Sequence, residues 1–333
     1  MRFIKILLIL LVVLTGVYFI GPRPGKPVFE TSLPTIPPIN QLESFISNNE
    51  GKHKVKGDNE ARIIWANDSL KQKTNYSIVY LHGFSASQEE GNPVHRNIAK
   101  QFGCNLYLAR LAEHGIDTVD ALFNYTPERL WESAKQAYAI GKEIGDTVIL
   151  MGTSTGGTVA LQLAAAYPEI GGLVLYSPNI AINDPNAWLL NDPWGLSIAR
   201  MVKKSDYITV DKEDDRYARY WNTKYSIEAA VQLEELLERT MVRETFEKIN
   251  QPLLTLYYYK DDKNQDPVVK VSAMKEMFAQ VNTVPNKKRM IPIPNAGSHV
   301  LASPIVSKDI KTVQDQTALF LKQVMGLQEK LIN

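Results

Sequence analysis

Cysteine is almost absent from the chain. Cys104 is the single cysteine among 333 residues, so an internal disulfide and a cysteine-based zinc or iron–sulfur site are excluded. Neither sign of charge predominates, since the chain has 37 basic and 36 acidic residues. Without a long basic run, a nucleic-acid partner has no electrostatic support. The five histidines show no metal-ligand spacing and no phosphate-loop pattern occurs, so we expect no metal and no organic cofactor.

The N-terminus carries a strong compositional signal. Arg2 and Lys5 precede an apolar run from Ile6 to Ile20 that contains no charged residue. As a helix at about 1.5 Å per residue this run reaches roughly 22 Å, less than the bilayer core of about 30 Å. That length is typical of a secretory signal or a short signal anchor, and the sequence after it offers a poor cleavage site. We predict that residues 1–20 anchor the protein to the membrane, with the globular part outside the inner membrane, periplasmic or extracellular. Cleavage would make the protein secreted.

Composition divides the rest of the chain into three parts. Six prolines fall in residues 21–40, which predicts an extended linker because proline fixes φ and removes backbone donors. Residues 41–179 and 249–333 alternate between strand-like and helix-like segments, which indicates an α/β fold with a doubly wound, mostly parallel sheet. Residues 180–248 interrupt this order with helical patterns and no convincing strand. We predict that they form a helical cap over the C-terminal edge of the sheet, where ligands of such sheets bind.

The individual elements follow from periodicity. Short apolar runs, rich in β-branched and aromatic residues, predict strands within residues 60–66, 76–84, 104–111, 146–154, 170–178, 251–262 and 287–294. Helical spacing of apolar residues predicts helices within residues 93–102, 127–145, 156–168, 268–281 and 309–326.

The segment VILMGTSTGG, residues 148–157, holds a serine between two glycines. It follows an expected strand and precedes a helix of small and apolar residues, and strand, Gly-x-Ser-x-Gly, helix is the arrangement of a nucleophile elbow. Gly152 and Gly156 would let the backbone pass close to its neighbours. The N-terminus of the following helix favours developing negative charge. Ser154 is therefore the predicted nucleophile.

A serine hydroxyl is a poor nucleophile without a base. His299 is the one histidine after Ser154, and it lies in a loop between the last expected strand and the last expected helix, so it is the predicted base. The acid that orients this base should follow the preceding strand. Asp261, Asp262 and Asp266 occur there. Asp266, at the start of a helical pattern, is preferred, and Asp262 stays open as the alternative.

Two backbone amides are expected to form an oxyanion hole. One belongs to Thr155, directly after the nucleophile. The other belongs to Phe84, in the loop after the strand at 76–84. Candidate pocket residues are two from that loop, one from the segment RLAEHGID and two aromatic residues from the predicted cap: His82, Gly83, His114, Trp188 and Trp221.

With these motifs the chain resembles the α/β-hydrolase superfamily, and within it the carboxylesterase and monoacylglycerol-lipase-like serine hydrolases. The resemblance begins near residue 55 and rests on LHGFSAS, GTSTGG, DPVV and GSH, in that order. It implies hydrolysis of carboxylic esters through an acyl-enzyme. The aromatic residues of the predicted cap favour a small-molecule ester with an apolar acyl group. Such enzymes usually have Gly-His-Gly where this chain has Glu113, His114 and Gly115, so the local turn departs from the family pattern.

Two alternatives use the same residues. A serine peptidase or amidase would need the same triad, and a panel of esters and amides separates it from an esterase. A non-catalytic hydrolase-like binding protein would display its cap to a ligand, and a fluorophosphonate probe would then fail to react with Ser154.

Overall fold

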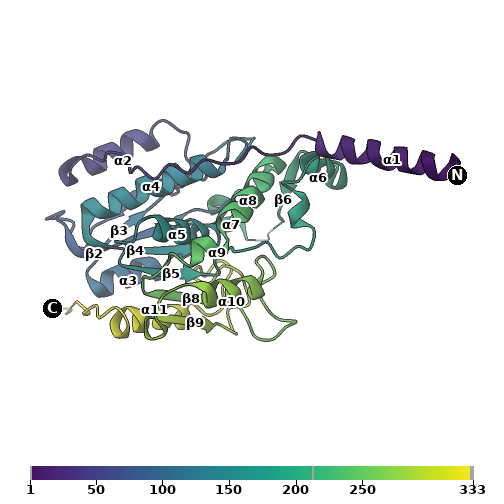
Figure 1. Cartoon of the computed structure of the whole chain (residues 1–333). Coiled ribbons are helices and arrows are strands. Elements are labelled where there is room, and N and C mark those ends of the chain that lie inside the picture. Colours follow the sequence, from purple (N-terminus) through teal and green to yellow (C-terminus); the bar gives the residue numbers. More distant parts are fainter. Residues whose placement is uncertain (1, 212–213, 331–333) are drawn as a thin grey trace.

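The computed structural model describes residues 2–211 and 214–330 and shows a central sheet between two layers of helices (Figure 1). Within these residues, seven strands form the main sheet in the order β1–β3–β2–β4–β5–β8–β9. β1 runs antiparallel to β3, and the other neighbours are parallel. The strands are β1 Arg62–Ile64, β2 Thr74–Leu81, β3 Asn105–Leu108, β4 Gly145–Thr153, β5 Gly172–Tyr176, β8 Leu253–Tyr257 and β9 Lys288–Pro292. The predicted doubly wound α/β fold is confirmed.

Each face of the sheet has its own hydrophobic core because the central strands are apolar on both sides. In β4, Val148 and Leu150 belong to one buried cluster while Ile149 and Met151 belong to the other, as the alternation of side chains along a strand requires. The first cluster includes residues of α4 Pro127–Ile144, α5 Thr155–Ala166 and α10 Val271–Gln280. The second includes residues of α3 Val94–Phe102 and α11 Ile310–Gln323.

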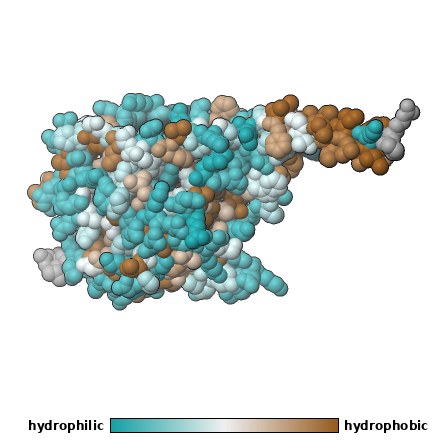
Figure 2. Space-filling model, viewed as in Figure 1, coloured by the Kyte–Doolittle hydropathy of each residue, from teal (hydrophilic) through white to brown (hydrophobic). Residues whose placement is uncertain are grey.

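The first helix, α1 Arg2–Phe19, projects from the body of the molecule, and its apolar side chains are exposed (Figures 1 and 2). Its C-terminal end is held by the insertion after β5. Tyr18 donates a hydrogen bond to Asp192 (3.1 Å), and the Trp194 indole donates to the Val17 carbonyl (3.0 Å). Among residues 2–211 and 214–330, no helix combines the length and the apolarity needed to cross a membrane.

The second half of the proline-rich segment is a strap on the body of the molecule. Phe29, Leu33 and Ile36 pack against the first core cluster. Side chains of α4 and of the residue after α5 donate hydrogen bonds to strap carbonyls: Trp131 to Glu30 (2.7 Å), Lys135 to Ser32 (2.9 Å) and Tyr167 to Thr31 (2.7 Å). Proline content predicts an extended backbone, but the side chains that hold this one lie 101 to 136 residues further along the chain. The strap, η1 Ile39–Gln41 and α2 Leu42–Glu50 lead into β1.

The insertion between β5 and β8 contains two strands as well as helices, so the expectation of no strand in residues 180–248 is wrong. In the described part of the insertion, β6 Tyr207–Thr209 and β7 Lys224–Ser226 pair antiparallel. Strands of three residues give almost no periodic signal, and their pairing is non-local. The other elements are η3 Ala187–Leu189, α6 Gly195–Lys203, α7 Asp215–Tyr220, α8 Ile227–Thr240 and α9 Arg243–Phe246.

Candidate active site

Ser154 stands on a sharp turn between β4 and α5. Its backbone has φ 53° and ψ −120°, a conformation that non-glycine residues seldom adopt and that costs of order 1–3 kcal/mol. The surrounding structure enforces it, because the Ser154 amide donates to the Tyr176 carbonyl of β5 (3.0 Å) and α5 begins at the next residue. This is the geometry of a nucleophile elbow, as the GTSTGG motif predicts.

The glycines of the motif are required by close backbone contacts. A Cβ on Gly156 would lie 1.9 Å from the Leu81 carbonyl oxygen of β2, and a Cβ on Gly152 would lie 2.6 Å from the backbone of Gly156. Neither contact involves a side chain that could move aside. Any larger residue would therefore push α5 away from the sheet and displace the serine.

His299 and Asp266 are bonded to each other. The His299 Nδ1 lies 2.7 Å from Asp266 Oδ2, and the Asp266 side chain is fully buried. The second oxygen, Oδ1, accepts hydrogen bonds from the amides of Val268 (2.9 Å) and Val269 (3.1 Å). Asp266 lies between β8 and α10, and His299 lies in the loop after β9. Both positions agree with those predicted from the chain order.

Charge and hydrogen bonding tune this pair. Burial alone would raise the pKa of Asp266, but the charge and hydrogen bond of His299 and the two amides outweigh burial, so the pKa lies below its usual value. Burial would lower the pKa of His299, but the charge and hydrogen bond of Asp266 and the charge of Glu90 outweigh it and raise that pKa. The carboxylate thus fixes the imidazole through Nδ1 and favours its positive form.

The other two acidic candidates face solvent. Asp262 accepts a hydrogen bond from the Tyr259 hydroxyl (2.8 Å), and Asp261 is bonded to Asn264. The structure therefore brings Asp266 to His299 and leaves Asp261 and Asp262 in an exposed loop.

The loop after β2 lies against the serine. A Cβ on Gly83 would be 3.0 Å from the Ser154 Cβ, so the Gly83 backbone passes beside Ser154. The Phe84 ring packs edge-on against Tyr125 (5.3 Å between ring centroids) and Tyr225 (5.2 Å). Thr155 is the first residue of α5. The two amides predicted for an oxyanion hole thus come from the loop beside Ser154 and from the first residue of α5.

Two buried histidines lie near this loop, and both have lowered pKa values. His82 Nδ1 donates to the Gly83 carbonyl (2.9 Å), and its Nε2 accepts from the Leu111 amide (3.0 Å). Burial and the neighbouring His114 hold the pKa of His82 well below its usual value. His114 Nδ1 bonds the Ala112 carbonyl (2.8 Å), and burial lowers the His114 pKa to about 4. His82 therefore links the loop after β2 to the segment after β3, through hydrogen bonds to the Gly83 carbonyl and the Leu111 amide.

The two tryptophans named from the insertion differ in position. Trp221 is buried, stacks on Tyr217 at 4.6 Å between centroids, and packs in one cluster with Ala86 and Val300, the residue after His299. Trp188 is 52% exposed. The structure brings Trp221 to the site and leaves Trp188 at the surface.

Glu90 is a residue of this site that sequence reasoning missed. It lies in η2 Gln88–Gly91, is 2% exposed, and its Oε2 accepts a hydrogen bond from the Gly83 amide (2.6 Å). Burial raises the pKa of Glu90 to about 7, against the opposing effects of the Gly83 amide, the His299 charge and hydrogen bonds with Trp221 and Tyr80. The polar stretch SQEEGNP gives no sign that one of its glutamates is buried.

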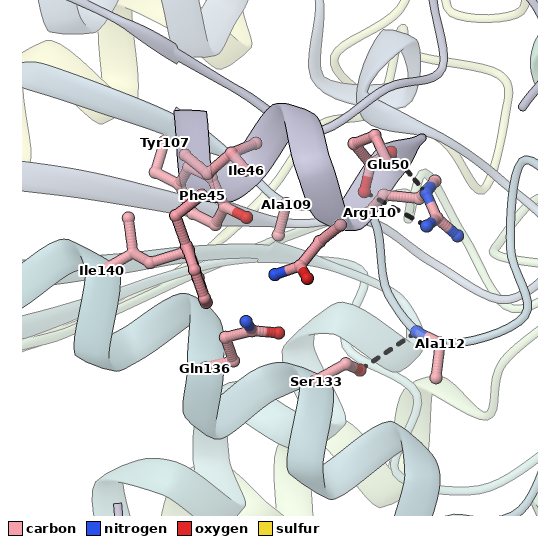
Figure 3. A pocket seen from close by; sticks show the side chains of 11 residues that line it. Phe45, Ile46, Glu50, Tyr107, Ala109, Arg110, Ala112, Ser133, Gln136 and Ile140 are labelled. Carbon is pink, nitrogen blue, oxygen red and sulfur yellow. Dashed lines mark hydrogen bonds and ion pairs between the residues drawn. The ribbon is translucent and has the colours of Figure 1, made fainter. Parts of the chain in front are cut away.

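A separate cavity of about 150 Å³ lies between α2 and α4 (Figure 3). The ion pair of Glu50 and Arg110 (2.6 Å) borders it, and none of the predicted site residues lines it. In the part of the chain that the structure describes, no group of three or more histidine, cysteine or acidic side chains is arranged to hold a metal ion.

Comparison with known proteins identifies a family whose pattern the chain matches. Residues 132–302 match the family described as “Serine aminopeptidase, S33”. Two similar solved structures are a protein from work on LipS and LipT, two metagenome-derived lipolytic enzymes (TM-score 0.62, 15% identity, 80% of this chain and 99% of that one), and the monoacylglycerol lipase of Paleococcus ferrophilus (TM-score 0.58, 15% identity, 80% and 98%). These likenesses show the α/β-hydrolase fold.

One curated relative also matches, a Saccharomyces cerevisiae protein named “Probable alcohol acetyltransferase”, 28% identical over 113 residues. The match covers 33% of this chain and 32% of the relative, so the chain spans about a third of the length of that protein. The family match, by contrast, covers just over half of the chain, from α4 to the loop after β9, and includes Ser154, Asp266 and His299. The protein therefore belongs to the serine aminopeptidase S33 family within the α/β-hydrolase superfamily.

Proposed function

We propose that the protein is a serine hydrolase that cleaves carboxylic esters through an acyl-enzyme. The observation that carries this proposal is the bonded pair of His299 and Asp266 in a fold that holds Ser154 on a strained elbow. The Gly83 backbone connects the two parts, because it abuts Ser154 on one side and the Glu90 carboxyl, which interacts with the His299 charge, on the other.

The first half of the reaction forms the acyl-enzyme. The Ser154 hydroxyl attacks the ester carbonyl carbon, and His299 takes its proton at Nε2, since Nδ1 is committed to Asp266. The amides of Phe84 and Thr155 stabilise the oxyanion, helped by the N-terminus of α5. The tetrahedral intermediate then collapses, and His299 returns the proton to the departing alcohol.

The second half releases the acid. His299 removes a proton from water, the resulting nucleophile attacks the acyl carbon, and the Ser154 oxygen leaves with the proton that His299 returns. Asp266 stays ionised throughout and stabilises the imidazolium of each half-reaction, as its lowered pKa favours.

An apolar acyl group suits the walls of this site. Phe84 of the predicted oxyanion loop packs with Tyr125 and Tyr225 in an aromatic cluster, and Trp221 packs in one cluster with Val300, the residue after His299. Pockets lined by apolar and aromatic side chains with few polar groups bind apolar ligands. The names of the two structural relatives, a lipolytic enzyme and a monoacylglycerol lipase, agree with such a substrate.

Hydrolysis of p-nitrophenyl esters of graded acyl length tests the proposal. We expect turnover by the wild type and a loss on the order of 10⁶ in kcat for Ser154→Ala, because the nucleophile is removed. Ser69→Ala, a change at an exposed serine, is the matched control and should retain full activity. Undiminished hydrolysis by a clean Ser154→Ala preparation would contradict the proposal.

A peptidase or amidase is the second candidate, and the family description, serine aminopeptidase, favours it. The same triad and oxyanion hole would act on an amide. Aminoacyl p-nitroanilides offered beside matched p-nitrophenyl esters decide between the two. We expect esters to have the higher kcat/KM, and a clear preference for anilides would replace the esterase assignment.

A further inference from the structure

Glu90 is a buried carboxyl group that none of the steps above uses. Its Oε2 accepts the Gly83 amide at 2.6 Å. A Cβ built on Gly83 would lie 2.9 and 3.0 Å from the two carboxylate oxygens and 3.0 Å from the Ser154 Cβ. The carboxyl and the nucleophile thus lie on two sides of one small space above the Gly83 backbone.

The elements packed around Glu90 place several titratable side chains near it. The titratable side chains facing it or adjoining it are Tyr80 of β2, Glu89 of η2, His95 of α3, Tyr217 of α7 and His299 of the loop after β9. Burial raises the pKa values of Tyr80, Glu89 and Tyr217 and lowers that of His95 to about 3. Among these neighbours, all within the described residues, His299 alone can become positive near neutral pH.

The hydrogen-bond partners of Glu90 lie on two segments that are far apart in the chain, the end of β2 with the loop after it and the insertion. Gly83 belongs to the predicted oxyanion loop, Tyr80 to β2, and Trp221 to the turn between α7 and β7. A shift of this carboxyl would therefore disturb the loop beside Ser154 and the insertion above it together.

We propose that Glu90 is a second carboxyl partner of His299, a positioning residue that fixes the Gly83–Phe84 loop and whose negative charge stabilises the positive form of the imidazole. Its catalytic consequence rests on the proposed function of Ser154 and His299. In the ionised state two carboxylates, Asp266 and Glu90, stabilise the imidazolium formed during each proton transfer. In the protonated state only Asp266 does so.

The proposal makes the protein's pH response depend on two coupled groups. Burial raises the pKa of Glu90 to about 7, so this carboxyl changes charge in the range in which His299 must be neutral to act as a base. Each group then titrates according to the state of the other. Ionised Glu90 raises the pKa of His299. The acid limb of the pH profile, where kcat/KM falls as the pH decreases, therefore moves to higher pH.

Glu90→Gln tests the charge. Glutamine keeps the length and an acceptor for the Gly83 amide but has no charge. We expect the acid limb of kcat/KM to move about one pH unit lower and kcat at pH 8 to fall about tenfold, the size of a one-unit change in proton affinity. Glu89→Gln is the matched control: Glu89 is half-buried and its Oε1 accepts a hydrogen bond from the Asn92 side-chain Nδ2 (3.1 Å). Loss of its charge should leave both quantities within about twofold. An unchanged acid limb in a folded Glu90→Gln protein would overturn the proposal.

Glu90→Asp separates the charge from the loop. Aspartate keeps the charge but withdraws the carboxyl from Gly83 by one methylene. We expect the acid limb to stay where the wild type has it, while kcat falls about tenfold because the oxyanion donors are less well placed. A Glu90→Asp profile that moves as far as that of Glu90→Gln would show that the charge has no separate role.

The His299 imidazole can be titrated by NMR without a substrate, which keeps this test independent of the esterase proposal. In the wild type we expect two inflections, one of His299 itself and one when Glu90 ionises. In Glu90→Gln we expect one, at lower pH. A single inflection in the wild type would contradict the proposal even if Glu90→Gln failed to fold. Absent ester hydrolysis with these titrations intact would count against the proposed function alone.

Discussion

Two buried carboxyl groups interact with the charge of the same histidine, and their pKa values are shifted in opposite directions. Asp266 is fully buried and has a lowered pKa, whereas Glu90 is almost as buried and has a pKa raised to about 7. Asp266 bonds the His299 ring directly and receives the amides of Val268 and Val269 as well. Glu90 receives one backbone amide, from Gly83, and interacts with His299 through charge. For Glu90, burial outweighs the hydrogen bonds and the charge of His299, whereas for Asp266 the bonded imidazole and the two amides outweigh burial.

The two carboxyls also arise from the sequence in different ways. Asp266 receives amides two and three residues further along its own turn, which is the local geometry that aspartate favours. Glu90 receives its partners from Gly83, seven residues before it, and from Trp221 in the insertion. A local pattern can therefore identify Asp266, while Glu90 becomes visible only when the chain is folded.

Asp266→Asn should give the largest effect in this comparison. The change leaves the shape but removes the charge that fixes the His299 tautomer, so we expect kcat to fall about 10⁴-fold. Asp262→Asn is the control, because Asp262 is exposed and bonds Tyr259, and kcat should stay within about twofold. Ester kinetics of both proteins at pH 8 measure the difference. Equal losses in the two variants would remove Asp266 from its assigned role.

Gly83→Ala disturbs the surroundings of Glu90, the second carboxyl group of the comparison. The added Cβ would lie within 3.0 Å of both Glu90 and Ser154, so one of them must move. We expect kcat to fall on the order of 10²-fold with KM nearly unchanged, since misplaced oxyanion donors act on the transition state. Gly57→Ala is the control, because no atom lies within 4 Å of its Cβ position. Wild-type kinetics in Gly83→Ala would show that this loop does not position the reacting groups.

The pH dependence of stability should have opposite signs for the two carboxyls. Glu90 has a raised folded pKa, so its contribution is complete below its unfolded value of about 4.3 and is lost as the pH rises through about 7. Relative to the wild type, Glu90→Gln should therefore gain up to ~3 kcal/mol between pH 4 and pH 8.

Asp266 has a lowered folded pKa, so its contribution is present above about pH 3.9 and is lost as the pH falls through the folded value. Asp266→Asn should accordingly be destabilised most at neutral pH and least in acid. Urea unfolding of both variants and the wild type at several pH values measures this. If the stability of both variants relative to the wild type changed with pH in the same direction, the proposed difference between the two carboxyl groups would be wrong.

Tyr167→Phe gives the smallest expected effect and tests whether the strap influences the two carboxyl groups and the catalytic site. The hydroxyl donates to the Thr31 carbonyl of the strap (2.7 Å), far from both carboxyls in the chain. We expect a loss of about 1 kcal/mol in the free energy of unfolding with unchanged kcat and an unchanged acid limb. A shifted pH profile in this variant would mean that strap and site are coupled.

Much of the main sheet and of the site could be predicted from the sequence because their signals are local. The strands are short apolar runs, and the tight contact of Gly156 with Leu81 requires a residue without a side chain. The chain order of Ser154, Asp266 and His299 is the order of the fold. Glu90, the strap and the β6–β7 pair escaped prediction because tertiary contacts create them. Their own sequences read as a polar turn, a proline-rich linker and a helical cap.

Labelling with a fluorophosphonate probe, followed by peptide mapping, tests the central claim most directly. If Ser154 is a nucleophile activated by His299, the wild-type protein should take up one label, on Ser154, and Ser154→Ala should take up none. Labelling should slow as the pH falls through the raised pKa of His299, because the protonated ring cannot accept the serine proton. A folded wild-type protein that stays unlabelled, or that is labelled on another serine, would contradict the account.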